Sequence, residues 1–86
     1  MTTFKREFQF NENIMETIAS NIRKYRIETH VTQEQLAVDI GVSPEYYRKF
    51  ESTLGSEGMS ASNIYKISVV LGIDINKFFE HEEEKK

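Results

Sequence analysis

The sequence contains no cysteine, a single proline and only four glycines among its 86 residues. Without cysteine there is no disulfide framework and no thiolate metal site, which agrees with a reducing cytoplasm. No apolar run approaches the roughly 18 residues needed to cross a bilayer, and the opening segment MTTFKREFQF lacks the apolar stretch of a signal peptide. We therefore expect a cytoplasmic protein with no membrane partner.

Clusters of catalytic or metal-binding residues are also lacking. The two histidines, His30 and His81, stand without a carboxylate, a cysteine or a second histidine at a ligand or relay spacing. Nothing pairs a nucleophile with a base. We expect no enzyme activity, no metal, no cofactor and no small-molecule substrate.

A net positive charge is lacking too, because the formal charge is −3. Four glutamates and two lysines follow Phe79, so the rest of the chain holds nine Lys/Arg and ten Asp/Glu and is nearly neutral. A neutral domain can still present a basic face to nucleic acid. That face would be assembled from Arg23, Lys24, Arg48, Lys49 and Lys66.

Residues 33–52, QEQLAVDIGVSPEYYRKFES, predict two short helices joined by a tight turn. Thr32 is a good N-cap for the first, Gln35 is placed to reach back to the cap amide, and Val31 can contact Leu36 across it. Leu36, Ala37 and Ile40 form one apolar face. Gly41 tolerates the positive φ at which such a helix ends.

The second helix begins with Ser43 as its N-cap, Pro44 at the first helical position and Glu45 in the first turn. Its inward residues are predicted to be Tyr47, Phe50 and Leu54. The residues that face outward are then Glu45, Tyr46, Arg48, Lys49 and Ser52. Ala37 at the crossing point and Gly41 at the bend favour a helix-turn-helix; the alternative is a plain pair of core helices.

The flanking segments predict three more helices, which makes the fold all-α with five short helices around one core. The first helix is capped by Asn11 or Asn13. The fourth is capped by Ser60 or Ser62 and ends at Gly72. The fifth is capped by Asp74, and Ile73 and Phe78 form a hydrophobic staple across that cap. The predicted buried residues are Ile14, Ile18, Ile22 and Tyr25 or Arg26 in the first helix, Ile64, Ile67, Val70 and Leu71 in the fourth, and Phe79, which closes the core.

We divide the chain into an arm at 1–12, a helical domain at 13–80 and a charged, acidic tail at 81–86. The arm carries Phe4, Phe8 and Phe10. Three interpretations stay open for it: a tail whose phenylalanines lie on the domain, a strand that pairs with a second subunit, or a contact with DNA.

The segment TQEQLAVDIGVSPEYYRKFE is similar to the lambda-repressor-like (Cro/repressor, or XRE) helix-turn-helix family, whose usual wording is close to TQEELAEKLGVSxxxIxxIE. IRKYRIETHV and SASNIYKISVVLGIDINKFF resemble its first, fourth and fifth helices, so the likeness covers residues 14–79. The resemblance implies sequence-specific binding of double-stranded DNA by a small bacterial transcription regulator at the nucleoid. It further implies a repressor of a phage or mobile element, acting as a homodimer on a pseudo-palindromic operator.

The resemblance also assigns site residues. It implies base-edge contacts from Pro44, Glu45, Tyr46 and Lys49, phosphate contacts from Gln33, Ser43 and Arg48, and a structural ion pair between Arg26 and Glu51. Pro44 offers only apolar contact, Glu45 can only accept and so favours cytosine N4, and Lys49 reaches guanine O6/N7 or a phosphate. The alternatives are a helix-dipole partner for Glu45, a packing role for Tyr46 and a phosphate contact for Arg26.

Two features depart from the family pattern. The loop Thr53–Met59 is longer than usual, lacks the family's basic residue and carries Glu57, which lowers the phosphate contact expected from that side. The aromatic arm and the acidic tail leave a second class of function open. In this alternative the protein is an antitoxin-like or other protein-interaction module that binds a partner protein, with or without DNA binding.

Overall fold

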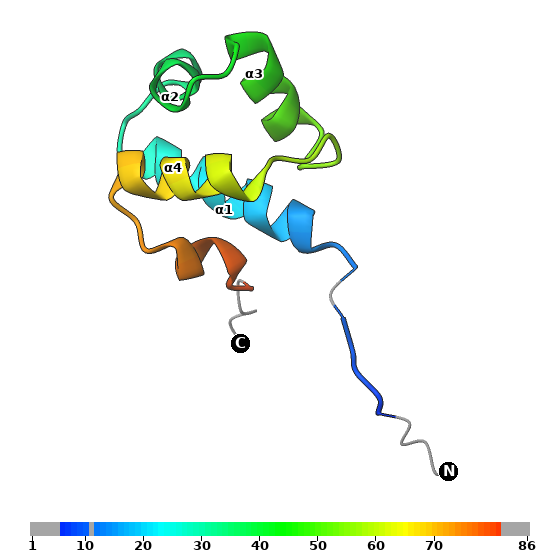
Figure 1. Ribbon diagram of the computed structural model, residues 1–86. Coiled ribbons are helices and arrows are strands. Elements are labelled where there is room, and N and C mark those ends of the chain that lie inside the picture. Colours follow the sequence, from blue (N-terminus) through cyan, green and yellow to red (C-terminus); the bar gives the residue numbers. More distant parts are fainter. Residues whose placement is uncertain (1–5, 11, 82–86) are drawn as a thin grey trace.

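The computed structural model describes residues 6–10 and 12–81. They form four α-helices and one 3-10 helix, with no strand in the described residues: α1 (Ile14–Glu28), α2 (Gln33–Ile40), α3 (Pro44–Ser52), α4 (Ala61–Leu71) and η1 (Ile75–Phe79). The all-helical fold of five short helices is thereby confirmed. In Figure 1, α1 and α4 lie beside one another, α2 and α3 stand together at one end of the molecule, and residues 6–10 lead away from the helices.

Hydroxyl side chains begin three of the helices. The Oγ atoms of Thr32, Ser43 and Ser60 accept hydrogen bonds from the amides of Gln35, Tyr46 and Asn63, at 3.0, 3.0 and 3.1 Å. The amide side chain of Gln35 does not return to the cap as predicted, because it donates to Asp39 one turn later. Asn13 occupies the N-cap position of α1 without a capping hydrogen bond from its side chain, and Asn11 lies outside the described residues.

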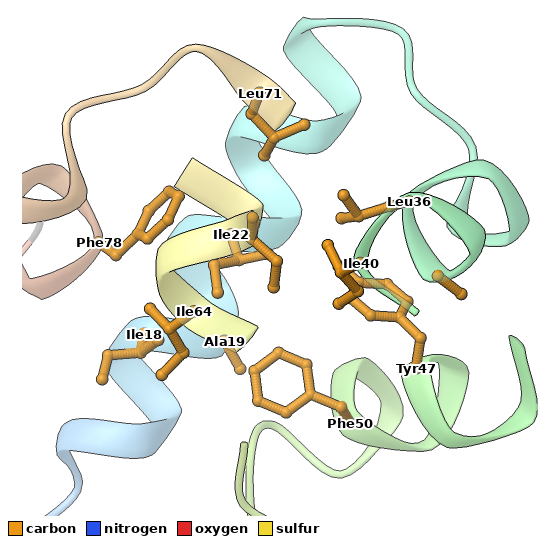
Figure 2. Close-up of a cluster of buried hydrophobic side chains, with 12 residues drawn as sticks. Ile18, Ala19, Ile22, Leu36, Ile40, Tyr47, Phe50, Ile64, Leu71 and Phe78 are labelled. Atoms are coloured by element: carbon orange, nitrogen blue, oxygen red, sulfur yellow. The ribbon is translucent and has the colours of Figure 1, made fainter. Parts of the chain in front are cut away.

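Residues from all five helices meet in one apolar core (Figure 2). Its fully buried members include Ile22 of α1, Leu36 of α2, Tyr47 and Phe50 of α3, and Phe78 of η1. Ala37 is also fully buried, in α2, which packs against both α3 and α4. The small side chain therefore lets these short helices approach closely.

The predicted core contained two errors on α3 and α4. Leu54 is 45% exposed because α3 ends at Ser52 and Leu54 adopts a left-handed conformation, with φ 51°. Val70 is on the surface, whereas Ser68 is buried. Ile64, Ile67, Ser68 and Leu71 follow the helical i, i+3, i+4, i+7 spacing, from which Val70 departs.

The closing residue of the core is Phe78 rather than Phe79, which is 45% exposed. The last helix is a 3-10 helix, in which residues three apart share a face. Ile75 and Phe78 therefore point together toward the core, and Phe79 points away from it. The side-chain amide of Asn21, buried on α1, donates to the carbonyls of Phe78 and Glu80 at 2.9 and 2.8 Å and so attaches η1 to α1.

Candidate nucleic-acid interface

The outward face of α3 is accessible along its length. Ser43, Glu45, Arg48 and Lys49 are exposed, and Pro44 and Tyr46 are half-buried, whereas Tyr47 and Phe50 face the core. Ser43, Glu45, Tyr46 and Lys49 line one shallow, open hollow in the surface. Three of the four predicted base-edge residues, Glu45, Tyr46 and Lys49, thus border one hollow, which Pro44 does not line.

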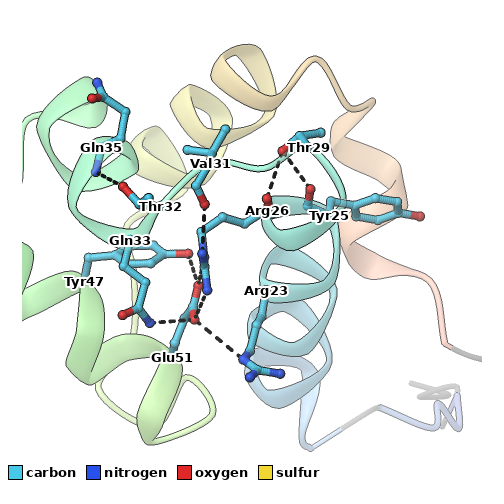
Figure 3. Close-up of polar contacts among 10 residues, drawn as sticks. All are labelled: Arg23, Tyr25, Arg26, Thr29, Val31, Thr32, Gln33, Gln35, Tyr47 and Glu51. Atoms are coloured by element: carbon cyan, nitrogen blue, oxygen red, sulfur yellow. Dashed lines mark hydrogen bonds and ion pairs between the residues drawn. The ribbon is translucent and has the colours of Figure 1, made fainter.

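The inner end of α3 is fixed by a buried ion pair between Arg26 and Glu51 (Figure 3). The guanidinium donates from Nε to Oε2 of the carboxylate at 2.7 Å and from Nη2 to Oε1 at 3.0 Å. Its Nη1 donates to the carbonyl of Val31 at 2.8 Å, just before the N-cap of α2. Arg26 therefore connects α1 to both helices of the turn, and each of its three guanidinium nitrogens donates a hydrogen bond within the protein.

Glu51 receives two further hydrogen bonds. The buried hydroxyl of Tyr47 donates to Oε2, and the side-chain amide of Gln33 donates to Oε1 at 2.8 Å. Burial alone would raise the pKa of the Glu51 carboxyl, but the hydrogen bonds from Arg26, Tyr47 and Gln33 outweigh it and hold that pKa below its ordinary value. Burial, together with the bond to Glu51, raises the pKa of the Tyr47 hydroxyl.

Gln33 stands at the start of α2, where a phosphate contact is expected, yet one of its two amide hydrogens is directed to Glu51. Arg23 on α1 approaches the same carboxylate, with its Nε 3.9 Å from Oε1 and its side chain 61% exposed. Figure 3 shows Arg23 and Gln33 on either side of Glu51. The exposed guanidinium therefore adds positive charge to this edge of the helix-turn-helix.

Tyr46 contacts the following loop. Its hydroxyl donates to the carbonyl of Gly58 at 3.1 Å, which gives the side chain a packing role on this surface. The ring still borders the hollow beside Glu45 and Lys49. A base contact from Tyr46 would therefore come from its ring edge or would require this hydrogen bond to open.

Both cations on the outer face of α3 lie near acidic side chains. Arg48 Nη1 is 3.3 Å from Glu34 Oε2 on α2, and Lys49 Nζ is 3.9 Å from Glu57 Oε2 in the loop after α3. All four side chains are more than 40% exposed, so these pairs are weak and are opened at little cost by a competing anion. Arg48 and Lys49 can thus exchange a carboxylate for a phosphate or a base.

Sequence reasoning missed several of these contacts. The hydrogen bond from Asn21 to Phe78 of η1 joins residues 57 positions apart in the sequence, and the bond from Tyr46 to Gly58 joins residues 12 positions apart. No local sequence pattern predicts either bond. A polar Asn21 next to Ile22 on the apolar stripe of α1 was the one available hint, because buried amides occur where they have partners.

Two negative observations apply to residues 6–10 and 12–81. No helix there is both long and apolar enough to span a membrane. No three His, Cys, Asp or Glu side chains gather in the described part of the chain in a way that could hold a metal ion.

Two short helices joined by a turn at Gly41, the second with an exposed outer face and packed against α1 and α2, define the class as a helix-turn-helix domain. A family model described as helix-turn-helix matches residues 22–78. The chain therefore belongs to the XRE-type helix-turn-helix family of DNA-binding regulators, and the family resemblance of its sequence is confirmed.

A solved structure supports the same class. The chain is similar to the crystal structure of the hypothetical transcription factor NHTF from Neisseria, with a TM-score of 0.68 and 25% sequence identity over 90% of this chain and 84% of that one. No curated protein matches the sequence significantly.

Proposed function

We propose that this protein binds double-stranded DNA sequence-specifically by placing α3 in the major groove, and that it acts as a small transcriptional repressor, of a phage or mobile element. The observation that carries the proposal is the exposed face of α3 within a helix-turn-helix. A major groove about 12 Å wide admits one bare helix. Ser43, at the start of α3, projects first into such a groove, and Glu45 and Lys49 follow one turn apart.

The proposed contacts divide by chemistry. Pro44, Glu45, Tyr46 and Lys49 would lie at base edges, with Glu45 accepting from cytosine N4 and Lys49 donating to guanine. Gln33, Ser43 and Arg48 would contact phosphates, helped by the exposed guanidinium of Arg23. Arg26 and Glu51 act as a structural pair, because both side chains are buried and satisfied within the protein.

One domain of this size offers few contacts, so we propose a homodimer on a pseudo-palindrome with half-sites about 34 Å apart. The domain division proposed is an arm at 1–12, a DNA-binding body at 13–80 and a tail at 81–86. The experiment that tests the function is selection of bound sequences from a random duplex pool at stated salt. Enrichment of a two-fold symmetric sequence supports the proposal, and recovery of no preferred sequence contradicts it.

The first variant to measure is Lys49→Ala. Because Lys49 is 63% exposed, its removal should weaken binding to the selected duplex and reduce the slope of log affinity against log salt by about 1 if it contacts phosphate. The melting temperature should barely move. Lys77→Ala is the matched control, since Lys77 lies on η1 away from α3 and is also exposed. Unchanged affinity of Lys49→Ala at low salt would refute its role.

A protein-interaction module is the second candidate, and the arm favours it. Phe8 and Phe10 are 59% and 76% exposed, their ring centroids lie 5.9 Å apart, and the guanidinium of Arg6 lies 5.0 Å from the Phe8 ring centroid. Exposed aromatic and arginine side chains are typical of protein interfaces. Phe4 lies outside the described residues, as does the tail from residue 82. A neighbouring toxin gene whose product binds the full chain but not Phe8→Ser/Phe10→Ser would support this antitoxin-like function.

A further inference from the structure

The loop between α3 and α4 contacts the outward face of α3 at two points. The hydroxyl of Tyr46 donates to the carbonyl of Gly58, and Lys49 Nζ lies 3.9 Å from the carboxylate of Glu57. Tyr46 and Lys49 are three residues apart and therefore share one side of the helix. The loop is thus held beside the residues proposed to read bases.

The loop has a defined shape, which fixes where Glu57 lies. Gly55 has φ +81° and is buried, and a Cβ atom there would come within 2.5 Å of the carbonyl oxygen of Met15 on α1. Its amide donates to Phe50 at 2.9 Å, and the amide of Gly58 donates to Gly55 at 2.8 Å. The backbone on both sides of Glu57 is therefore anchored, and its carboxylate is presented next to α3.

A second acid approaches α3 from the other side, because Glu34 of α2 pairs with Arg48 at 3.3 Å. Each outward cation of α3 therefore has an acidic neighbour from an adjacent element, and α3 itself adds Glu45. Among α3 and the acids paired with it, leaving Arg23 at the neighbouring edge aside, three acids stand against two cations, an excess of one negative charge. Phosphate attraction, which supplies essentially all non-specific DNA binding, is correspondingly weak here.

We propose that Glu57, assisted by Glu34, is a specificity-determining residue that suppresses binding to non-operator DNA. The Glu57 carboxylate does not fix the exposed Lys49 side chain, but its negative charge repels a backbone phosphate that approaches Lys49. At the operator, Lys49 is directed to a base acceptor instead, and this contact offsets the loss of the pair with Glu57. Specificity thus arises from a repulsive element as well as an attractive one. The inference rests on the proposed function of α3.

The test compares wild-type protein with Glu57→Gln on two duplexes of equal length, the selected operator and an unrelated sequence, over a salt series. Glu57→Gln should raise affinity for the unrelated duplex by roughly threefold to tenfold and steepen its salt slope by about 0.9, as one more phosphate contact requires. Operator affinity should rise less, so that the specificity ratio falls. Glu34→Gln should act in the same direction through Arg48.

Two further variants test whether the effect of Glu57 depends on Lys49 and on the contact between the loop and α3. The gain on unrelated DNA should vanish in Glu57→Gln/Lys49→Ala, because it depends on Lys49. Tyr46→Phe removes the hydrogen bond between α3 and Gly58 without removing any charge, and it should also lower the specificity ratio. Glu80→Gln is the control for the change in net charge, since Glu80 is exposed and follows η1, away from α3; its two affinities should keep the wild-type ratio.

The possible failures are distinguishable. If wild-type protein selects no preferred duplex, the proposed DNA-binding function fails and this inference fails with it. If wild-type protein binds an operator but Glu57→Gln changes both affinities by the same factor, only the specificity role is overturned. Persistence of the gain in the Lys49→Ala background overturns it as well. Melting curves of each variant verify folding, and little change is expected because the Lys49–Glu57 pair is exposed.

Discussion

Glu51 is the one carboxylate buried among the described residues, with 5% of its surface exposed. A buried charge costs several kcal/mol unless it is paired and hydrogen-bonded. Two bonds from Arg26 and one each from Tyr47 and Gln33 meet this requirement, and every buried side-chain nitrogen or oxygen in the described part of the chain has a partner. The ion pair therefore links α3 to α1.

The depressed pKa of Glu51 has a consequence for acid stability. An unfolded glutamate titrates near pH 4.3. Because folding lowers the pKa of Glu51, its contribution to the free energy of unfolding is fully present above about pH 4.3 and is lost as the pH falls through the lower, folded pKa. The contribution is lost because, as the pH falls, a proton binds to Glu51 of the unfolded chain before one binds to Glu51 of the folded protein.

We predict that Glu51→Gln lowers the free energy of unfolding by about 3 kcal/mol at pH 7, since it leaves Arg26 without its counter-charge. The free energy of unfolding of the variant should also fall less as the pH is lowered, because the titration of Glu51 no longer contributes to it. Urea unfolding at a series of pH values from neutral to acid measures both effects. Glu28→Gln, at an exposed carboxyl on the same helix as Arg26, should match wild type. A wild-type pH profile in Glu51→Gln would contradict the assignment.

Helix boundaries in the helix-turn-helix were predictable because their signals are local. Thr32, Ser43 and Gly41 act on backbone groups within four residues, and each occupies the expected cap position. The end of the core was less predictable, because the choice between Phe78 and Phe79 depends on whether the last turn is 3-10 or α. The neighbours of Tyr46 and Lys49 depend on how an irregular loop folds back, which no periodicity encodes.

Among the contacts between helices, the attachment of η1 to α1 is the one that a single substitution tests most directly. Asn21→Leu removes both amide donors and leaves the Phe78 carbonyl without its buried partner, which should lower the free energy of unfolding by about 2 kcal/mol. Amide hydrogen exchange in η1 should accelerate more than exchange in α2 or α3. Ser20→Ala, at the adjacent exposed position, is the control. Equal protection of η1 in both variants would show that Asn21 is not the attachment.

At the scale of the whole molecule, the distribution of charge weakens non-specific binding to nucleic acid. The chain is acidic overall, and the acids Glu34, Glu45 and Glu57 accompany the two cations of α3. A single domain of this kind gains little from long-range attraction to phosphate. Tight binding would therefore have to come from base contacts repeated in two subunits, which is the physical reason for proposing a dimer.

The proposed dimer leads to a prediction about operator geometry. Two α3 helices related by a two-fold axis read half-sites about one helical turn apart on the same face of the duplex. Inserting five base pairs between the half-sites rotates one of them to the opposite face, so affinity should fall on the order of a hundredfold, which is the loss expected when a second linked contact becomes impossible. Titration of labelled duplexes measures this loss. Scrambling one half-site is the matched control and should give the same weakened affinity as the insertion. A complex of one protein chain per duplex, with the same affinity for the duplexes with and without the insertion, would show that the protein binds DNA as a monomer, with all of its specificity in one α3.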